Sequence, residues 1–122
     1  MSTCHEGSWI GVDLDGTLAQ WDGVWRGVEY IGEPIPATVN QIKVWLSEGK
    51  DVRIFTARVC PDGRDDEGEL QKARAAIVRW CEKHLGVALQ ITYCKDRKMY
   101  ELWDDRCVCV ERNTGKILGR NP

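Results

Sequence analysis

The sequence has no long apolar run, and no segment approaches the ~20 consecutive apolar residues that a membrane-spanning helix needs. Its first residues, MSTCHEGSW, lack the basic start and the apolar stretch of a secretory signal. An excess of positive charge is also missing: the formal net charge is −2, so the overall charge does not indicate binding to nucleic acid. These absences predict a cytoplasmic protein that does not enter a membrane, and they leave its oligomeric state open.

The six cysteines contain no C-x-x-C pair, the spacing typical of zinc and redox motifs. Thiols in a cytoplasmic protein stay reduced, so we expect small buried thiols rather than disulfides. A zinc site built from Cys4, His5, Cys107 and Cys109 is the alternative, although nothing in their spacing favours it.

The length and composition predict one globular domain that covers residues 1–122. The chain is too short for two ordinary domains, and its 43% hydrophobic and 30% charged residues argue against wholesale disorder. Apolar spacing of two residues indicates strands, and spacing of three and four residues indicates helices. The predicted elements are strands at 9–12, 51–56, 89–94 and 101–103, helices at 36–48 and 70–85, and a hairpin over 107–118 that closes one side of the sheet.

The most informative stretch is the first predicted strand and the residues that follow it. The apolar run 9–12 ends in two carboxylates, Asp13 and Asp15. Alternate strand residues face the same side, so both are expected to point at one spot at the C-terminal edge of the sheet, where parallel sheets bind ligands. Gly16 permits a sharp turn and a close approach to a ligand, and the Thr17 hydroxyl can hold that turn or bind a ligand oxygen, so both are candidate substrate-binding residues. Two like charges this close need a cation or a shared proton between them, and Mg²⁺ fits an oxygen-rich site.

The next segment, residues 19–35, combines glycine and proline with three aromatic residues, Trp21, Trp25 and Tyr30. This composition predicts a loop or short hairpin that places aromatic side chains over the carboxylates. The alternative, at equal odds, is that the tryptophans only cover the core of a small domain. The segment is too short to form a separate cap domain.

The string DLDGTLAQWD after an apolar strand resembles the first motif of the haloacid dehalogenase-like phosphohydrolases, whose pattern is D-x-D-G-T. Later segments match that family's further motifs in the same order. The second motif is an apolar strand that ends in a hydroxyl residue, here Thr56, and the third supplies a lysine, here Lys95 with Lys98 as the rival. The fourth is an apolar strand that runs into paired aspartates, here Asp104 and Asp105. These matches extend over about residues 9–118.

The resemblance implies a fold, which is a doubly wound, mostly parallel α/β sheet of the Rossmann-like kind without a cap. It also implies that Asp13 is the nucleophile, which becomes an aspartyl-phosphate, and that Asp15 is the general acid and then base. Asp15 can be protonated at neutral pH only if burial and the adjacent charge raise its pKa. Thr56 and Lys95 would hold the transferring oxygens. Mg²⁺ would be bound by Asp13, the backbone carbonyl of Asp15, one or both of Asp104 and Asp105, and the phosphate.

Two arginines are candidate phosphate ligands. Arg58 lies two residues after Thr56, and its guanidinium can grip a phosphate bidentately. The alternative, at equal odds, is an ordinary surface arginine that pairs with a nearby acid, which the sequence offers at Asp62, Asp65 and Asp66. Arg106 completes the string D-D-R, which is similar to the closing motif of the phosphatase half of polynucleotide kinase-phosphatases. His84, near the end of the second helix, is expected to be a capping or surface residue rather than a base.

The implied reaction is magnesium-dependent hydrolysis of a phosphomonoester, and the substrate stays open. The D-D-R resemblance favours nucleic-acid ends that carry a 3′-phosphate, with Trp21, Trp25 or the basic cluster 95–98 in contact with the strand. A nucleotide or a sugar phosphate is the rival substrate. Two further alternatives are a phosphate- or partner-binding module without turnover and a receiver domain, which would hold a long-lived aspartyl-phosphate.

Overall fold

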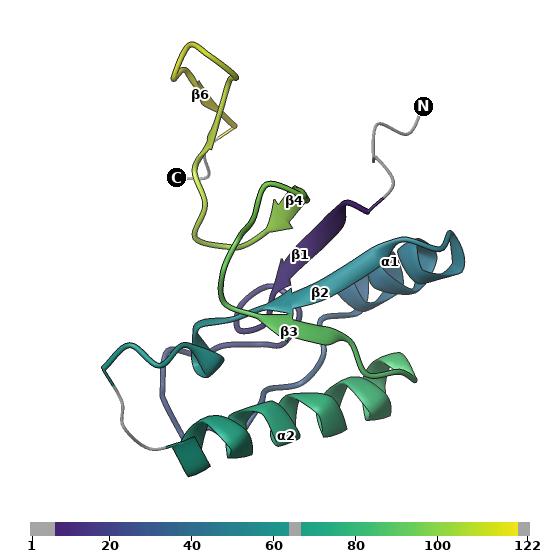
Figure 1. The fold of residues 1–122 in the computed structure, drawn as a ribbon, viewed down its shortest axis with the longest axis vertical. Coiled ribbons are helices and arrows are strands. Elements are labelled where there is room, and N and C mark those ends of the chain that lie inside the picture. Colours follow the sequence, from purple (N-terminus) through teal and green to yellow (C-terminus); the bar gives the residue numbers. More distant parts are fainter. Residues whose placement is uncertain (1–6, 64–66, 120–122) are drawn as a thin grey trace.

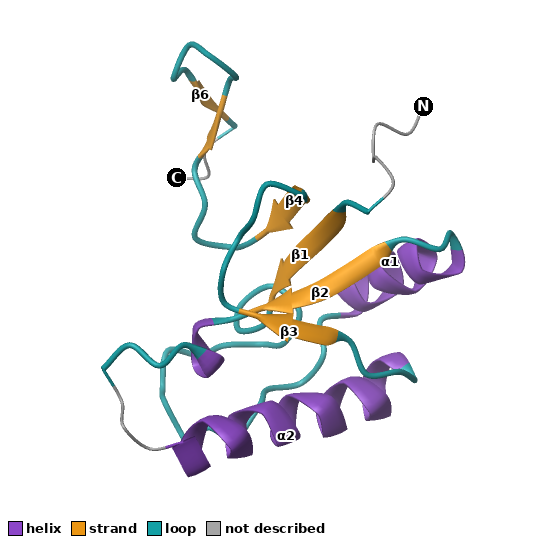
Figure 2. Cartoon of the chain, in the orientation of Figure 1, coloured by secondary structure: helices purple, strands orange, loops and turns teal. Residues whose placement is uncertain are grey.

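The computed structural model describes residues 7–63 and 67–119. Four of the residues named above, Cys4, His5, Asp65 and Asp66, lie outside the described residues. The elements, coloured by type in Figure 2, are β1 (Trp9–Asp13), α1 (Pro36–Ser47), β2 (Asp51–Phe55), the 3₁₀ turn η1 (Ala57–Val59), α2 (Glu67–Leu85), β3 (Gln90–Thr92), β4 (Met99–Trp103), β5 (Cys109–Val110) and β6 (Ile117–Leu118).

The first four strands form one parallel sheet in the order β3-β2-β1-β4 (Figure 1). The chain moves outward from β1 to β2 and β3, and then returns to the other side of β1 as β4. This reversal is the doubly wound order of Rossmann-like folds, so the predicted α/β fold is confirmed. It places a switch point between β1 and β4, and at such a point the C-terminal ends of neighbouring strands leave a crevice for a ligand.

α1 lies in the crossover from β1 to β2, and α2 lies in the crossover from β2 to β3. The two crossovers run in the same direction along the sheet, and parallel crossovers are right-handed, so both helices cover the same face. On that face Ile10 of β1 and Ile54 of β2 belong to one buried cluster with Ile42 of α1 and Ile77 of α2. Each such side chain stabilises the fold by roughly 1.5–3 kcal/mol through burial. No described helix is long and apolar enough to span a membrane.

The opposite face of the sheet is covered differently. The segment 93–98, which joins β3 to β4, contains no helix. Its Asp96 accepts a hydrogen bond from the indole of Trp9 at 2.9 Å, and the Arg53 guanidinium lies 4.7 Å from the centre of a Trp9 ring. Trp9 is therefore buried under polar side chains instead of a helix. The third crossover of the sheet, from β3 to β4, is thus a short connector.

The predicted hairpin forms, but it does not close the sheet. β5 and β6 pair only with each other, as a two-stranded antiparallel ribbon that projects from the body in Figure 1. A hydrogen bond from the Glu111 amide to the Lys116 carbonyl, at 2.7 Å, closes the turn locally. Exposed apolar side chains occupy both faces of the ribbon, with Leu118 on one and Ile117 on the other. No single apolar face exists to dock against the sheet, which explains why that prediction was wrong.

Candidate metal and phosphate site

Three carboxylates meet at the switch point of the sheet. Asp13 is the last residue of β1, and Asp104 and Asp105 directly follow β4. Because β1 and β4 are parallel neighbours, with Val12 opposite Trp103, their C-terminal ends lie side by side. One oxygen from each of the three carboxylates lies within 4.8 Å of the others. The structure therefore brings these three predicted residues together in one acidic cluster.

Thr17 and Gly16 hold this acidic cluster in place. The Thr17 hydroxyl accepts a hydrogen bond from the backbone amide of Asp105 at 3.0 Å, and its oxygen lies 3.4 Å from a carboxylate oxygen of Asp13. Gly16 has a φ of +93°, and a Cβ at this position would lie 2.5 Å from a carboxylate oxygen of Asp105. Both residues were predicted to bind substrate. In the structure they contact the carboxylates.

The negative charges of the carboxylates in the acidic cluster repel one another. Partial burial raises the pKa of Asp13 from 3.8 to about 8, and the negative charges of Asp104, Asp105 and Asp15 add to this effect. Loss of water and nearby like charges both disfavour the ionised carboxylate. A hard divalent cation would remove this penalty, and three carboxylate oxygens are ligands that Mg²⁺ accepts. The donor set therefore fits the predicted metal.

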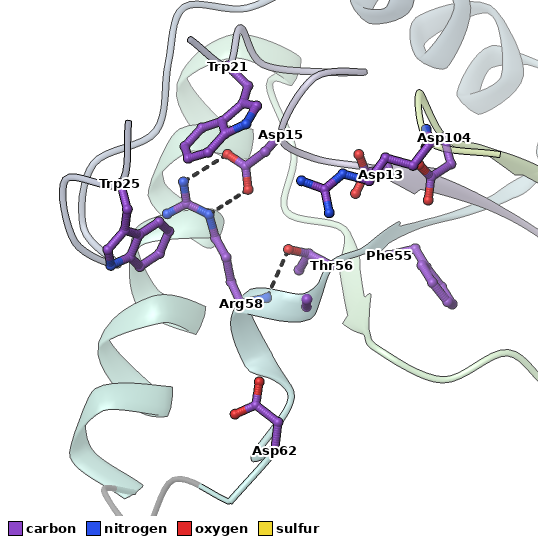
Figure 3. Close-up of a pocket in the computed structure, with 11 residues that line it drawn as sticks. Asp13, Asp15, Trp21, Trp25, Phe55, Thr56, Arg58, Asp62 and Asp104 are labelled. Atoms are coloured by element: carbon purple, nitrogen blue, oxygen red, sulfur yellow. Dashed lines mark hydrogen bonds and ion pairs between the residues drawn. The ribbon is translucent and has the colours of Figure 1, made fainter. Parts of the chain in front are cut away.

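The Asp15 carboxylate is held by an arginine instead of joining the acidic cluster. The Nε and Nη2 groups of Arg58 donate to its two oxygens, each at 2.8 Å (Figure 3). Asp15 lies beyond the end of β1, where the alternation of strand side chains no longer applies. Asp13 and Asp15 therefore line the same cavity, but their carboxylates do not point at one spot, and that expectation was wrong. Metal binding by the Asp15 backbone carbonyl stays a prediction.

Arg58 connects three parts of the molecule, and neither sequence-based alternative named its partner. Its side chain is almost completely buried. Besides binding Asp15, it donates to the backbone carbonyl of Val28 at 3.2 Å and lies 4.9 Å from the centre of a Trp25 ring. Its backbone amide donates to the Thr56 hydroxyl at 3.2 Å. Arg58 thus links Asp15 to the turn η1 and to the aromatic segment.

A cavity of about 510 Å³ opens beside these groups. Asp13 and Asp104 lie at one side of it, whereas Asp15, Arg58 and the two tryptophans lie at the other (Figure 3). The complete lining is Asp13, Asp15, Trp21, Trp25, Phe55, Thr56, Ala57, Arg58, Asp62, Asp104 and Arg106. The predicted loop therefore places its tryptophans beside the carboxylates.

The fold is similar to a solved structure. That structure is a conserved protein from Bacteroides thetaiotaomicron, described as coded by a locus of that organism. The two chains share 26% identity with a TM-score of 0.51 over 81% of this chain and 76% of the other. No family model and no curated protein matches the sequence. The likeness supports the Rossmann-like α/β fold and names no activity.

The predicted lysine is not part of the cavity lining. β3 ends at Thr92 rather than at residue 94, so Lys95 lies in the connector to β4, where it is exposed and outside the lining. The Lys98 carbonyl accepts a hydrogen bond from the Trp9 amide at 3.0 Å, at the opposite end of β1 from Asp13. Arg58 and Arg106 are the cations among the residues that line the cavity.

His84 and the thiols at positions that the structure describes are not members of the acidic cluster, although Cys107 and Cys109 line a cavity together with Asp104 and Asp105. Cys81 is buried, which raises the pKa of its thiol to about 11, as expected for an unreactive core residue. Cys94, Cys107 and Cys109 are exposed, so the expectation of buried thiols was wrong for these three. The His84 ring packs against Trp80 at a tilt of 55°, with 4.6 Å between ring centres, and does not line the cavity.

Proposed function

We propose that this chain is a magnesium-dependent phosphomonoester hydrolase that works through an aspartyl-phosphate, as its resemblance to the haloacid dehalogenase-like phosphohydrolases implies. One observation carries the proposal. Asp13 ends a central parallel strand, belongs to a cluster of three carboxylates, and lines an open cavity that Thr56 also lines. The candidate nucleophile Asp13, its neighbour Asp104 in the acidic cluster, and Thr56 thus line one cavity that can admit a phosphate ester.

In the proposed reaction Mg²⁺, held by Asp13, Asp104 and Asp105, would offset the negative charge of the nucleophile and the phosphate. Asp13 attacks phosphorus, and the bond from phosphorus to the ester oxygen breaks as Asp15 donates a proton to that oxygen. Water then attacks phosphorus while Asp15 accepts its proton, and the bond from phosphorus to the Asp13 oxygen breaks, which releases inorganic phosphate and restores the Asp13 carboxylate. The Thr56 hydroxyl donates a hydrogen bond to a non-bridging phosphate oxygen.

The pair between Asp15 and Arg58 bears directly on this sequence of steps. Both Asp15 oxygens accept hydrogen bonds from Arg58, so neither can carry a proton until one of these hydrogen bonds breaks. The first step needs the protonated form, so the ion pair must loosen before Asp15 donates its proton. A substrate phosphate, which also binds guanidinium bidentately, is the natural competitor for Arg58. Arg58 would then contact phosphate during the first step and Asp15 during the second.

The same ion pair favours a second candidate function, which is a phosphate-binding module without turnover. Arg58 holds both Asp15 oxygens, which leaves neither of them placed to donate a proton to a leaving group, and the predicted lysine does not line the cavity. Such a module would bind phosphate esters at this cavity and release none of the phosphate.

The deciding experiment is phosphate release from a generic aryl phosphate, with and without Mg²⁺. We expect magnesium-dependent release by the wild-type protein and none by Asp13→Asn. Asp62→Asn is the matched control, because Asp62 lines the same cavity outside the acidic cluster and has a positive φ that asparagine tolerates. Full activity in Asp13→Asn would contradict the nucleophile assignment, whereas binding of the ester without release would favour the module.

A further inference from the structure

Three large aromatic side chains from one segment are exposed next to the candidate site. The exposed fractions are 37% for Trp21, 55% for Trp25 and 50% for Tyr30. Trp21 and Trp25 line the cavity of about 510 Å³, and Trp21 and Tyr30 line an adjoining one of about 170 Å³. Asp15 and Arg58 line both cavities. The aromatic residues therefore form a wall, the aromatic wall, that runs from one cavity into the other.

Two members of this wall, Trp25 and Tyr30, are held in position by arginines. Arg58 lies against the Trp25 ring and also binds the carbonyl of Val28 in the same segment. The Arg26 guanidinium lies 5.2 Å from the centre of the Tyr30 ring and pairs with Asp22 at 2.8 Å. Exposed aromatic groups gathered around a concave polar site are a feature of ligand-binding surfaces. Flat rings fixed in this way can stack on another flat ring.

Trp21 and Trp25 of this wall lie on the Asp15 side of the larger cavity, away from Asp13 and Asp104 (Figure 3). In the proposed reaction Asp15 protonates the leaving oxygen, so this is the side that the leaving group occupies. From this placement, and resting on the proposed function, we infer that the substrate is a nucleoside monophosphate whose base stacks on Trp21 and Trp25. Stacking on aromatic side chains is available to every base, so the wall selects for a base rather than for one particular base.

The charges around the cavities favour a single nucleotide over a nucleic-acid end. A polyanionic strand needs a groove with several cations that follow its backbone. Of the three arginines that line these cavities, Arg58 and Arg26 are already paired with Asp15 and Asp22, which leaves Arg106 without a salt bridge to any described residue. The linings of the two cavities also contain Asp62, Asp22 and Glu33. One phosphate is matched by this charge distribution, whereas a run of phosphates is not.

The test compares kcat/KM for adenosine 5′-monophosphate and adenosine 3′-monophosphate with kcat/KM for ribose 5-phosphate, which lacks the base. We expect the better nucleotide to exceed ribose 5-phosphate by about tenfold or more, the scale of one stacking contact. Trp21→Leu should reduce this ratio several-fold, and Trp25→Leu should do the same while also disturbing Arg58. Tyr100→Leu is the matched control, because Tyr100 is 38% exposed on β4 and lines neither cavity. It should leave the ratio unchanged.

Equal kcat/KM for the nucleotides and ribose 5-phosphate would overturn the inference and leave the proposed hydrolase function standing. The same holds if neither tryptophan substitution changes the ratio of the two kcat/KM values. A marked preference for a 3′-phosphorylated oligonucleotide over both mononucleotides would overturn the assignment to a single nucleotide. If no ester at all is hydrolysed, the proposed function has failed, and calorimetric binding to Asp13→Asn still decides the inference. Binding of adenosine monophosphate at least tenfold tighter than ribose 5-phosphate would support it, and equal affinity would overturn it.

Discussion

Replacing Arg58 by methionine is the sharpest test of how this site is held together, because the chain contains a matched control. Arg26 also binds an aspartate through two hydrogen bonds, with a shortest distance of 2.8 Å, and also lies over an aromatic ring. The two pairs differ mainly in burial. The side chains of Arg58 and Asp15 are 5% and 23% exposed, whereas those of Arg26 and Asp22 are 42% and 57% exposed.

The difference in burial sets the expected magnitude. Breaking a buried ion pair costs about 3–5 kcal/mol, because the remaining charge is left without a partner in a poorly solvated place. Asp15 keeps some contact with water, so we expect Arg58→Met to lower the free energy of unfolding by about 2–3 kcal/mol. For a chain of this length that corresponds to a fall of about 8–12 °C in Tm. Exposed pairs often contribute nothing measurable, so Arg26→Met should leave Tm close to that of the wild type.

Urea and thermal unfolding followed by circular dichroism at pH 7 would measure both changes. The double variant Asp15→Asn with Arg58→Met should recover part of the lost stability, because no unpaired charge is then left behind. If Arg58→Met is no more destabilising than Arg26→Met, burial is not what gives the Asp15 pair its strength, and the reasoning fails.

Three further predictions concern the acidic cluster and the lysines. The pKa of Asp13 is raised to about 8, so the metal-free protein should lose stability as pH rises from about 4 to about 8, because the unfolded chain releases this proton first. In thermal unfolding with a chelator present, Asp13→Asn should flatten this dependence of Tm on pH, and a Tm of the wild type that does not change with pH would refute the prediction. Mg²⁺ should also bind the wild type more tightly at pH 8 than at pH 6. Gly16→Ala should weaken Mg²⁺ binding in calorimetry by displacing the Asp105 carboxylate, whereas Gly23→Ala, with a similar φ of +88° and open space around it, should strain the backbone alone. Lys98→Ala should leave phosphate release unchanged, and a large loss of kcat would contradict its place at the far end of β1.

Much of the fold was predictable because its signals are local. α1 was expected over 36–48 and spans Pro36–Ser47, since Pro36 starts a helix and Gly49 ends one. α2 begins three residues before the predicted Leu70 and ends as predicted at Leu85. The ends of β3 were not predictable, because they depend on pairing with β2, where Thr92 lies opposite the last strand residue, Phe55.

The candidate site was predictable where strand ends determine it and unpredictable where side chains choose among partners. Asp13, Asp104 and Asp105 follow apolar runs, so parallel pairing alone brings them together. The partner of Arg58 depends on the route of the aromatic segment across the site, and no local pattern encodes that route. The sequence offered nearby acids such as Asp62, whereas the fold supplies Asp15, which is much farther away along the chain.

The strand order also determines when the acidic cluster can exist. Asp13 ends the first strand of the parallel sheet, whereas Asp104 and Asp105 follow its last strand. One edge of β1 therefore has no partner strand until β4 is added. During synthesis the helices and the first three strands emerge before all three carboxylates of the acidic cluster are present. A cation that binds all three carboxylates binds only the finished sheet, so it shifts the folding equilibrium towards the pairing of β1 with β4. Metal affinity would then report on the completion of folding as well as on chemistry.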